Sequence, residues 1–187
     1  ASGGGVFADN GATLNLAGGI ISGNATYDKA INNGENTRDG GYGGGVYTKG
    51  AKVTISGSAC ITNNRVDARI TDIDNLGNNG LLGGGGIACT HDGTLNLTGG
   101  FVTANYSYEA GGGVYAGFYD KDNDGEIEKI TFKMTGGTIA GNVADNAEGG
   151  GLRVAGGDSA GTMATINASD TGRVYITNNK TNTGSTK

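Results

Sequence analysis

The fold is decided by a stretch that recurs five times along the chain, and its most regular copy is GGGVYTKGAKVTISGSACITNN, residues 43–64. Each copy opens on three glycines before an apolar residue and closes on a β-branched residue three positions before an asparagine. Between these marks the apolar residues alternate with a period of two, which is typical of β-strands and not of helices. The five closing residues are Asn24, Asn64, Asn105, Asn142 and Asn179.

The spacing between these marks indicates a solenoid. The last glycine of the opening run stands 19 residues before the closing asparagine in the first three copies (5 to 24, 45 to 64, 86 to 105). The remaining variation in length falls at a few fixed places, as expected for structural repeats that carry loop insertions. The sequence therefore predicts an all-β fold, a right-handed parallel β-helix of about five coils with loop insertions. We expect a single domain over residues 1–187.

Glycine and asparagine are expected to supply the turns between the strands. The chain has 40 glycines and no proline. Glycine adopts positive φ without steric cost, and asparagine tolerates the left-handed conformation better than most residues do. The absence of proline fits strands that must donate hydrogen bonds on both edges. We expect the five closing asparagines to stack as a ladder at one corner, with their amides bonding up and down the stack.

Composition excludes several classes of protein. The net charge is −5, and the sequence has no basic cluster of the kind that binds nucleic acid. It has no run of 18 apolar residues that could span a membrane as a helix. The start Ala1-Ser2-Gly3 shows neither an initiator methionine nor a signal peptide, so we expect a segment of a longer or assembling surface protein. Whether Cys60 and Cys89 form a disulfide stays open.

Residues 120–128, DKDNDGEIE, predict a calcium-binding loop. Carboxylates at loop positions 1, 3 and 5 converge on one hard cation, and the glycine at position 6 permits the sharp turn. Position 12, which is usually a bidentate glutamate, is Thr131, so Glu128 would have to complete the coordination. The alternative is a solvated acidic hairpin. The expected Ca²⁺ ligands are Asp120, Asp122, Asp124, Glu126 (through its backbone carbonyl) and Glu128.

Three aromatic residues are candidates for a binding stripe. Phe7, Tyr47 and Tyr115 each follow an apolar residue that faces the interior, so the alternation turns them outward on one face. Such a stripe would stack on sugars or contact a protein. The alternative is that these rings only shield the strand surface.

The Gly-Gly-Gly-Val/Ile openings and the Ile/Val-x-x-Asn closings cover residues 3–179 and resemble the repeats of a known group of bacterial surface proteins. These are the polymorphic outer-membrane and autotransporter-passenger families, whose repeats are GG-A-hydrophobic and F-x-x-N. Isoleucine or valine stands here where those families have phenylalanine. The resemblance implies a right-handed parallel β-helix and a secreted or cell-surface adhesin.

Together these features predict an extracellular, non-catalytic, adhesin-like or structural segment that mediates surface attachment or assembly. Its partner would be a glycan or a protein on a surface. One alternative is a fibre subunit that stacks end to end, because open solenoid ends present unpaired backbone edges. Another is a polysaccharide lyase or glycoside hydrolase, because acidic residues gather after the asparagine corner. Arg38, Arg65 and Arg69 would then neutralise a uronate, or else pair with those acids.

Overall fold

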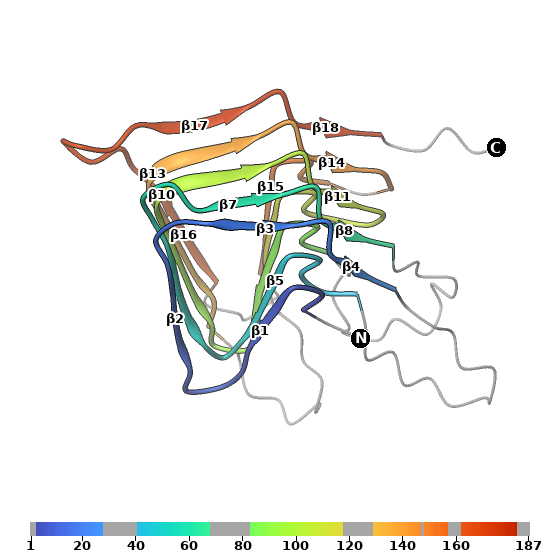
Figure 1. The fold of residues 1–187 in the computed structure, drawn as a ribbon, viewed down its shortest axis with the longest axis horizontal. Coiled ribbons are helices and arrows are strands. Elements are labelled where there is room, and N and C mark those ends of the chain that lie inside the picture. The colour runs from blue at the N-terminus through green and yellow to red at the C-terminus, as the bar shows by residue number, and fades with distance from the viewer. Residues whose placement is uncertain are drawn as a thin grey trace.

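The structure is a computed structural model that describes residues 3–27, 41–67, 83–117, 129–146, 148–156 and 162–182. Within these ranges every regular element is a β-strand, and every strand pairing is parallel. The chain winds through the same series of faces coil after coil, with equivalent strands stacked above one another (Figure 1). The all-β parallel solenoid that the repeats predict is therefore confirmed.

The strands follow the repeats of the sequence. The first coil contains β1 (Val6–Ala8), β2 (Thr13–Leu16), β3 (Ile20–Ser22) and β4 (Ala25–Thr26). The second contains β5 (Val46–Lys49), β6 (Lys52–Ile55), β7 (Cys60–Thr62) and β8 (Arg65–Val66). The third contains β9 (Ile87–Thr90), β10 (Thr94–Thr103) and β11 (Tyr106–Ser107), and the fourth contains β12 (Val114–Gly117), β13 (Thr131–Ala140) and β14 (Val143–Ala144). The last contains β15 (Leu152–Ala155), β16 (Met163–Ile166), β17 (Val174–Thr177) and β18 (Lys180–Thr181).

Three sheets form the walls of the solenoid. The first sheet has the order β1-β5-β9-β12-β15, and the third has the order β4-β8-β11-β14-β18. The second sheet has eight strands, because the long strands β10 and β13 each run through a bend that separates two strands in the neighbouring coils. Among the described strands, those of three coils are paired on both sides. The closed solenoid therefore has about three turns, fewer than the five predicted, with a coil paired on one side at each end.

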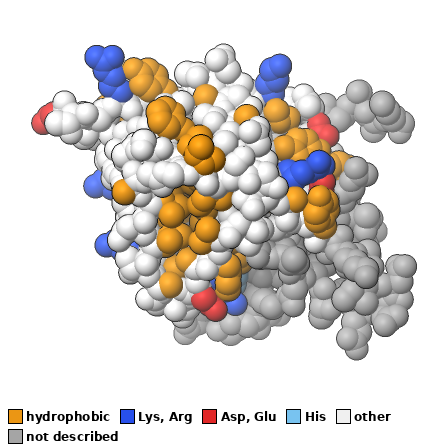
Figure 2. Space-filling view, in the orientation of Figure 1, with side chains coloured by type: hydrophobic (Ala, Val, Ile, Leu, Met, Phe, Trp, Pro, Cys, Tyr) orange, Lys and Arg blue, Asp and Glu red, His pale blue; other side chains and the backbone are white. Residues whose placement is uncertain are grey.

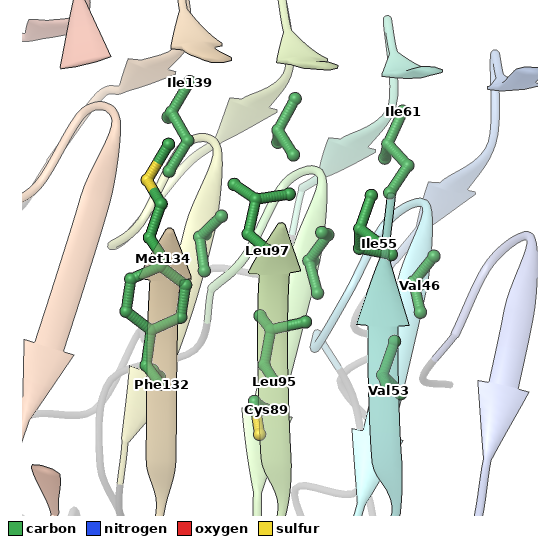
Figure 3. Packing of buried hydrophobic residues seen from close by; sticks show 14 of the residues in the cluster. Val46, Val53, Ile55, Ile61, Cys89, Leu95, Leu97, Phe132, Met134 and Ile139 are labelled. Atoms are coloured by element: carbon green, nitrogen blue, oxygen red, sulfur yellow. The ribbon is translucent and has the colours of Figure 1, made fainter. Parts of the chain in front are cut away.

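The core consists of apolar columns that run along the stack. Leu95 on β10 is in register with Val53 on β6 and Phe132 on β13, and Leu97 is in register with Ile55 and Met134. All six side chains are buried, and Figure 3 shows them in neighbouring columns inside the solenoid. Because inward residues repeat at every second position, each of these three four-residue stretches adds two such side chains to the core.

The glycine runs serve two physical purposes. The first glycine of a run turns the chain, as at Gly43 with φ +58°. The last glycine of a run allows close packing instead: a Cβ at Gly86 would lie 2.7 Å from the oxygen of Gly113 and 2.8 Å from Nδ2 of Asn105. Larger residues there would push the ladder asparagine out of its column.

The ladder asparagines were expected to occupy the asparagine corner because asparagine tolerates the left-handed backbone conformation. That reason is wrong, because none of the five has a positive φ. The positive φ belongs to the residue before each of them, as at Ala104 with φ +53°. The ladder residue is needed for its side-chain amide, while its neighbour makes the turn. The turning residues are Gly23, Asn63, Ala104, Gly141 and Asn178.

Candidate binding site on the third sheet

The ladder of asparagines forms the corner that leads into the third sheet. Oδ1 of Asn105 accepts hydrogen bonds from the backbone N–H of Asn64 at 3.0 Å and from its Nδ2 at 3.1 Å. Nδ2 of Asn105 donates to Oδ1 of Asn142 at 3.0 Å and to the carbonyl of Ile61 at 2.9 Å. The same amide-to-amide bonds connect Asn24, Asn64, Asn105, Asn142 and Asn179 in turn, as the spacing predicts.

The strands of the third sheet begin directly after the ladder. Their middle residues, such as Val66 and Ser107, are buried. The residues on either side of these are more exposed, and they form two outward columns. One column contains Ala25, Arg65, Tyr106, Val143 and Lys180, and the other contains Tyr27, Asp67, Tyr108, Asp145 and Asn182.

Five of these residues make up what we call the third-sheet face: Tyr27, Arg65, Asp67, Tyr106 and Asp145. Arg65 forms an ion pair with Asp67, and its guanidinium lies 5.5 Å from the centre of the Tyr106 ring. The Tyr106 hydroxyl donates to Oδ2 of Asp145 at 3.1 Å. Acidic, basic and aromatic groups from three successive coils are thereby joined in one network.

The same contacts set the protonation of the network. Partial burial, followed by the hydrogen bond to Asp145, raises the pKa of Tyr106 to about 12. The hydrogen bond to Asp67 raises the pKa of the Arg65 guanidinium, against a smaller opposing effect of burial. Near neutral pH the face therefore holds a neutral phenol that donates a hydrogen bond to the Asp145 carboxylate, next to an arginine that stays charged.

The third-sheet face is open to solvent. Tyr27 is 58% exposed, and the Arg65 side chain is 51% exposed. Figure 2 shows hydrophobic, basic and acidic side chains next to one another on the side where β8 and β11 lie. An exposed ring beside fixed donors and acceptors can stack on an apolar sugar face and hydrogen-bond its hydroxyls. The arrangement is chemically suited to binding a polar ligand.

The predicted aromatic stripe is not an exposed surface. Phe7 is 50% exposed, but Tyr47 and Tyr115 are only 5% and 1% exposed. The Tyr47 ring stacks on Phe7 and on Tyr42, with centroids 5.4 Å apart in both pairs. Tyr47 and Tyr115 lie in an apolar cluster separate from the solenoid core, together with Tyr42 and Val66. The alternation gave their direction correctly, but other side chains cover them, so they contribute to packing.

The predicted calcium loop lies outside the described residues, including its ligands Asp120, Asp122, Asp124, Glu126 and Glu128. In the described part of the chain, no group of three or more His, Cys, Asp or Glu residues is placed to hold a metal ion. Cys60 and Cys89 are both free thiols. Burial raises the pKa of Cys89 to about 12, so this thiol is not activated as a nucleophile.

Sequence reasoning singled out neither Tyr27 nor Tyr106 as a binding residue, although it expected Arg65 to pair with a nearby acid. Strands of two residues are too short to show a period. The usable signal is positional: the first and third residues after each ladder asparagine face outward.

Comparisons of the chain with protein-family models, with curated proteins and with solved structures found no match. The assignment as a parallel β-solenoid therefore depends on the strand pairing itself. Among the described residues there is also no helix with the length and apolar character needed to cross a membrane.

Proposed function

We propose that this chain is an extracellular, non-catalytic, adhesin-like β-solenoid segment that binds a glycan through the third-sheet face. The observation that carries the proposal is the network Asp67–Arg65–Tyr106–Asp145 next to the exposed ring of Tyr27. A rigid stack of coils holds these groups at fixed spacing, about 4.8 Å from coil to coil. Little side-chain entropy is then lost when a ligand binds, which favours affinity.

The contacts of the two carboxylates support binding more than catalysis. Asp67 is paired with Arg65, and Asp145 accepts hydrogen bonds from Tyr106 and from Nδ2 of Asn182 at 2.9 Å. A general acid or base needs a proton that it can exchange with the substrate. Carboxylates held by donors on the protein instead present oriented lone pairs to sugar hydroxyls. Arg65 favours glycans that carry a carboxylate, because its guanidinium can form a bidentate pair with one.

The test is a glycan array probed with the 187-residue protein, followed by titration calorimetry on the best glycan. Tyr27→Ala and Arg65→Ala are each expected to weaken binding about tenfold, since each removes roughly 1.4 kcal/mol of contact free energy. Tyr175→Ala is the matched control, because Tyr175 is 45% exposed on β17, in the second sheet. Circular dichroism checks that each variant keeps the fold.

Three outcomes would reject the proposal. The first is no binding to any glycan, and the second is an equal loss of binding for Tyr27→Ala and Tyr175→Ala. The third is release of reducing or unsaturated ends from the bound polysaccharide, abolished by Asp145→Asn; that result would establish the lyase or hydrolase alternative.

We further propose that residues 120–128 bind Ca²⁺ and that the ion stabilises this insertion without taking part in chemistry. The support is the spacing of carboxylates and glycine in the sequence. Calcium chloride should raise the melting temperature of EGTA-treated protein, because an ion bound only to the folded state stabilises it. Asp122→Asn should abolish this shift, and Asp9→Asn, a change at an exposed residue elsewhere, should not. An equal calcium shift in all three proteins would contradict the assignment.

A further inference from the structure

We propose that the last coil of one copy pairs with the first coil of a second copy. The asparagine ladder and the apolar columns would then continue from one chain to the next. The proposal goes beyond glycan binding, because it involves the two ends of the solenoid and not the third-sheet face. It depends on the chemical complementarity of these two ends.

The two ends of the asparagine ladder are complementary. Along the stack, each ladder asparagine donates its backbone N–H and its Nδ2 to Oδ1 of the next. Within the described residues, Oδ1 of Asn24 has no donor from a preceding coil, and the N–H of Asn179 has no acceptor in a following one. One end of the ladder therefore offers an acceptor, and the other end offers donors.

A second hydrogen bond of the ladder is also incomplete at the first coil. In the other coils, Nδ2 of the ladder asparagine donates to a carbonyl of the preceding coil at 2.9–3.0 Å, as Asn64 does to Ile21. Nδ2 of Asn24 donates instead to the carbonyl of Ser22 in its own coil, at 3.3 Å. In a stacked pair, the carbonyl of Ile176 from the last coil of the first copy would occupy the missing position next to Asn24 of the second copy.

The apolar columns match in the same way. Val154, Ile166 and Ile176 occupy inward columns of the last coil, yet they are 40%, 48% and 40% exposed. The corresponding first-coil residues on these columns include Leu16 and Ile21, which are only half-buried. Figure 2 shows hydrophobic side chains gathered in the area bounded by β1, β2 and β3. Stacking would place Ile166 over Leu16 and Ile176 over Ile21, and it would remove both surfaces from water.

One outer column adds a favourable contact. Phe7, Tyr47 and Tyr115 share an outward column with Arg153, which pairs in register with Tyr115. The next position on that column would be Phe7 of the second copy, which is 50% exposed. A guanidinium stacked on a phenylalanine ring is a favourable cation–π pair.

A second copy is the partner that satisfies all of these positions together. It supplies the ladder acceptor, the missing carbonyl and the apolar columns in the same register. Two identical ends could not do so, because both would present acceptors or both would present donors. The contact is therefore head to tail, and such a contact can repeat without closing, which gives filaments.

The experiment is sedimentation velocity on the 187-residue protein from micromolar to millimolar concentration. We expect the mean mass to rise with concentration. Ile166→Lys blocks only the last-coil end, and Leu16→Lys blocks only the first-coil end. Each variant alone should associate at least tenfold more weakly than the parent protein. An equimolar mixture of the two should form a dimer and stop there, because one intact end of each kind remains. If Leu16→Lys does not fold, Asn24→Ala takes its place, because it removes the Oδ1 acceptor that the ladder presents at the same end.

Met163→Lys is the matched control, because Met163 is 57% exposed in the same coil but lies on an outward column. It should associate as the parent protein does. A monomer at every concentration, association that Ile166→Lys leaves unchanged, or a dimer of Leu16→Lys alone would each overturn the proposal. Tyr27→Ala should still associate, and Ile166→Lys should still bind glycan, so that failure of one proposal does not imply failure of the other.

Discussion

Replacing Asn105 by alanine should destabilise the solenoid severely. The Asn105 side chain is 1% exposed and takes part in four hydrogen bonds, two with Asn64, one with Asn142 and one with the carbonyl of Ile61. The substitution deprives the buried N–H of Asn64 of its acceptor, at a cost of about 1–3 kcal/mol. The other lost bonds are partly compensated, because Nδ2 of Asn64 still reaches the carbonyl of Ile21. We expect a total loss of about 3–5 kcal/mol in the free energy of unfolding.

Asn24→Ala provides the internal comparison, because it removes the same side chain at the end of the ladder. The backbone N–H of Asn24 keeps its bond to Oδ1 of Asn64, and the amide loses one bond of 2.9 Å and one of 3.3 Å. The expected cost is about 1 kcal/mol. Urea denaturation followed by far-ultraviolet circular dichroism measures both values. Equal losses for the two variants, or a loss below about 1 kcal/mol for Asn105→Ala, would refute the view that the inner ladder bonds hold the coils together.

Three further outcomes follow from single residues. Ala104→Gly should raise the free energy of unfolding by up to about 1 kcal/mol, seen as a higher urea midpoint, because it relieves the left-handed φ of +53° at an exposed position; a lower midpoint would contradict this. At pH 8 a thiol reagent should label half-exposed Cys60 in the native protein and reach Cys89 only after denaturation, since burial raises the pKa of Cys89 to about 12. The pKa values of Tyr106 and Tyr115 are raised to about 12, so the stability that the neutral phenols contribute should be complete below about pH 10 and lost as the pH rises towards 12. Spectrophotometric titration checks this, and ionisation of all tyrosines near pH 10 in a folded protein would count against it.

Most of the solenoid could be predicted because its regularities are local and repeat along the chain. The alternation at Val53-Thr54-Ile55 gives a strand with both apolar residues inside, and the structure buries both. Asn64 marks the corner, since its amide bonds to the equivalent residue one coil away. The number of closed turns was overestimated, because a repeat in the sequence does not show whether a coil has neighbours on both sides.

The aromatic residues show where periodicity stops being informative. Alternation reports which side of a strand a residue faces, and it placed Tyr47 and Tyr115 outside the solenoid core correctly. It does not report what lies beyond that side. Tyr42 and Val66 come from other parts of the repeat and lie against these rings. Burial by residues outside the periodic strand cannot be derived from the strand itself.

The asparagine ladder and the third-sheet face depend on each other. The strands of this face are only two residues long, too short to be stable alone. Each is attached to the ladder through the backbone: the N–H of Arg65 donates to the carbonyl of Asn24, and the N–H of Tyr106 donates to that of Asn64, both at 2.9 Å. Thus the amide side chains fix the spacing of the coils, while the carbonyls of the same asparagines fix the position of the residues proposed to bind. An insertion placed after the face lengthens a coil without moving Arg65 relative to Tyr106, so the solenoid can vary its loops and keep the arrangement of the proposed binding surface.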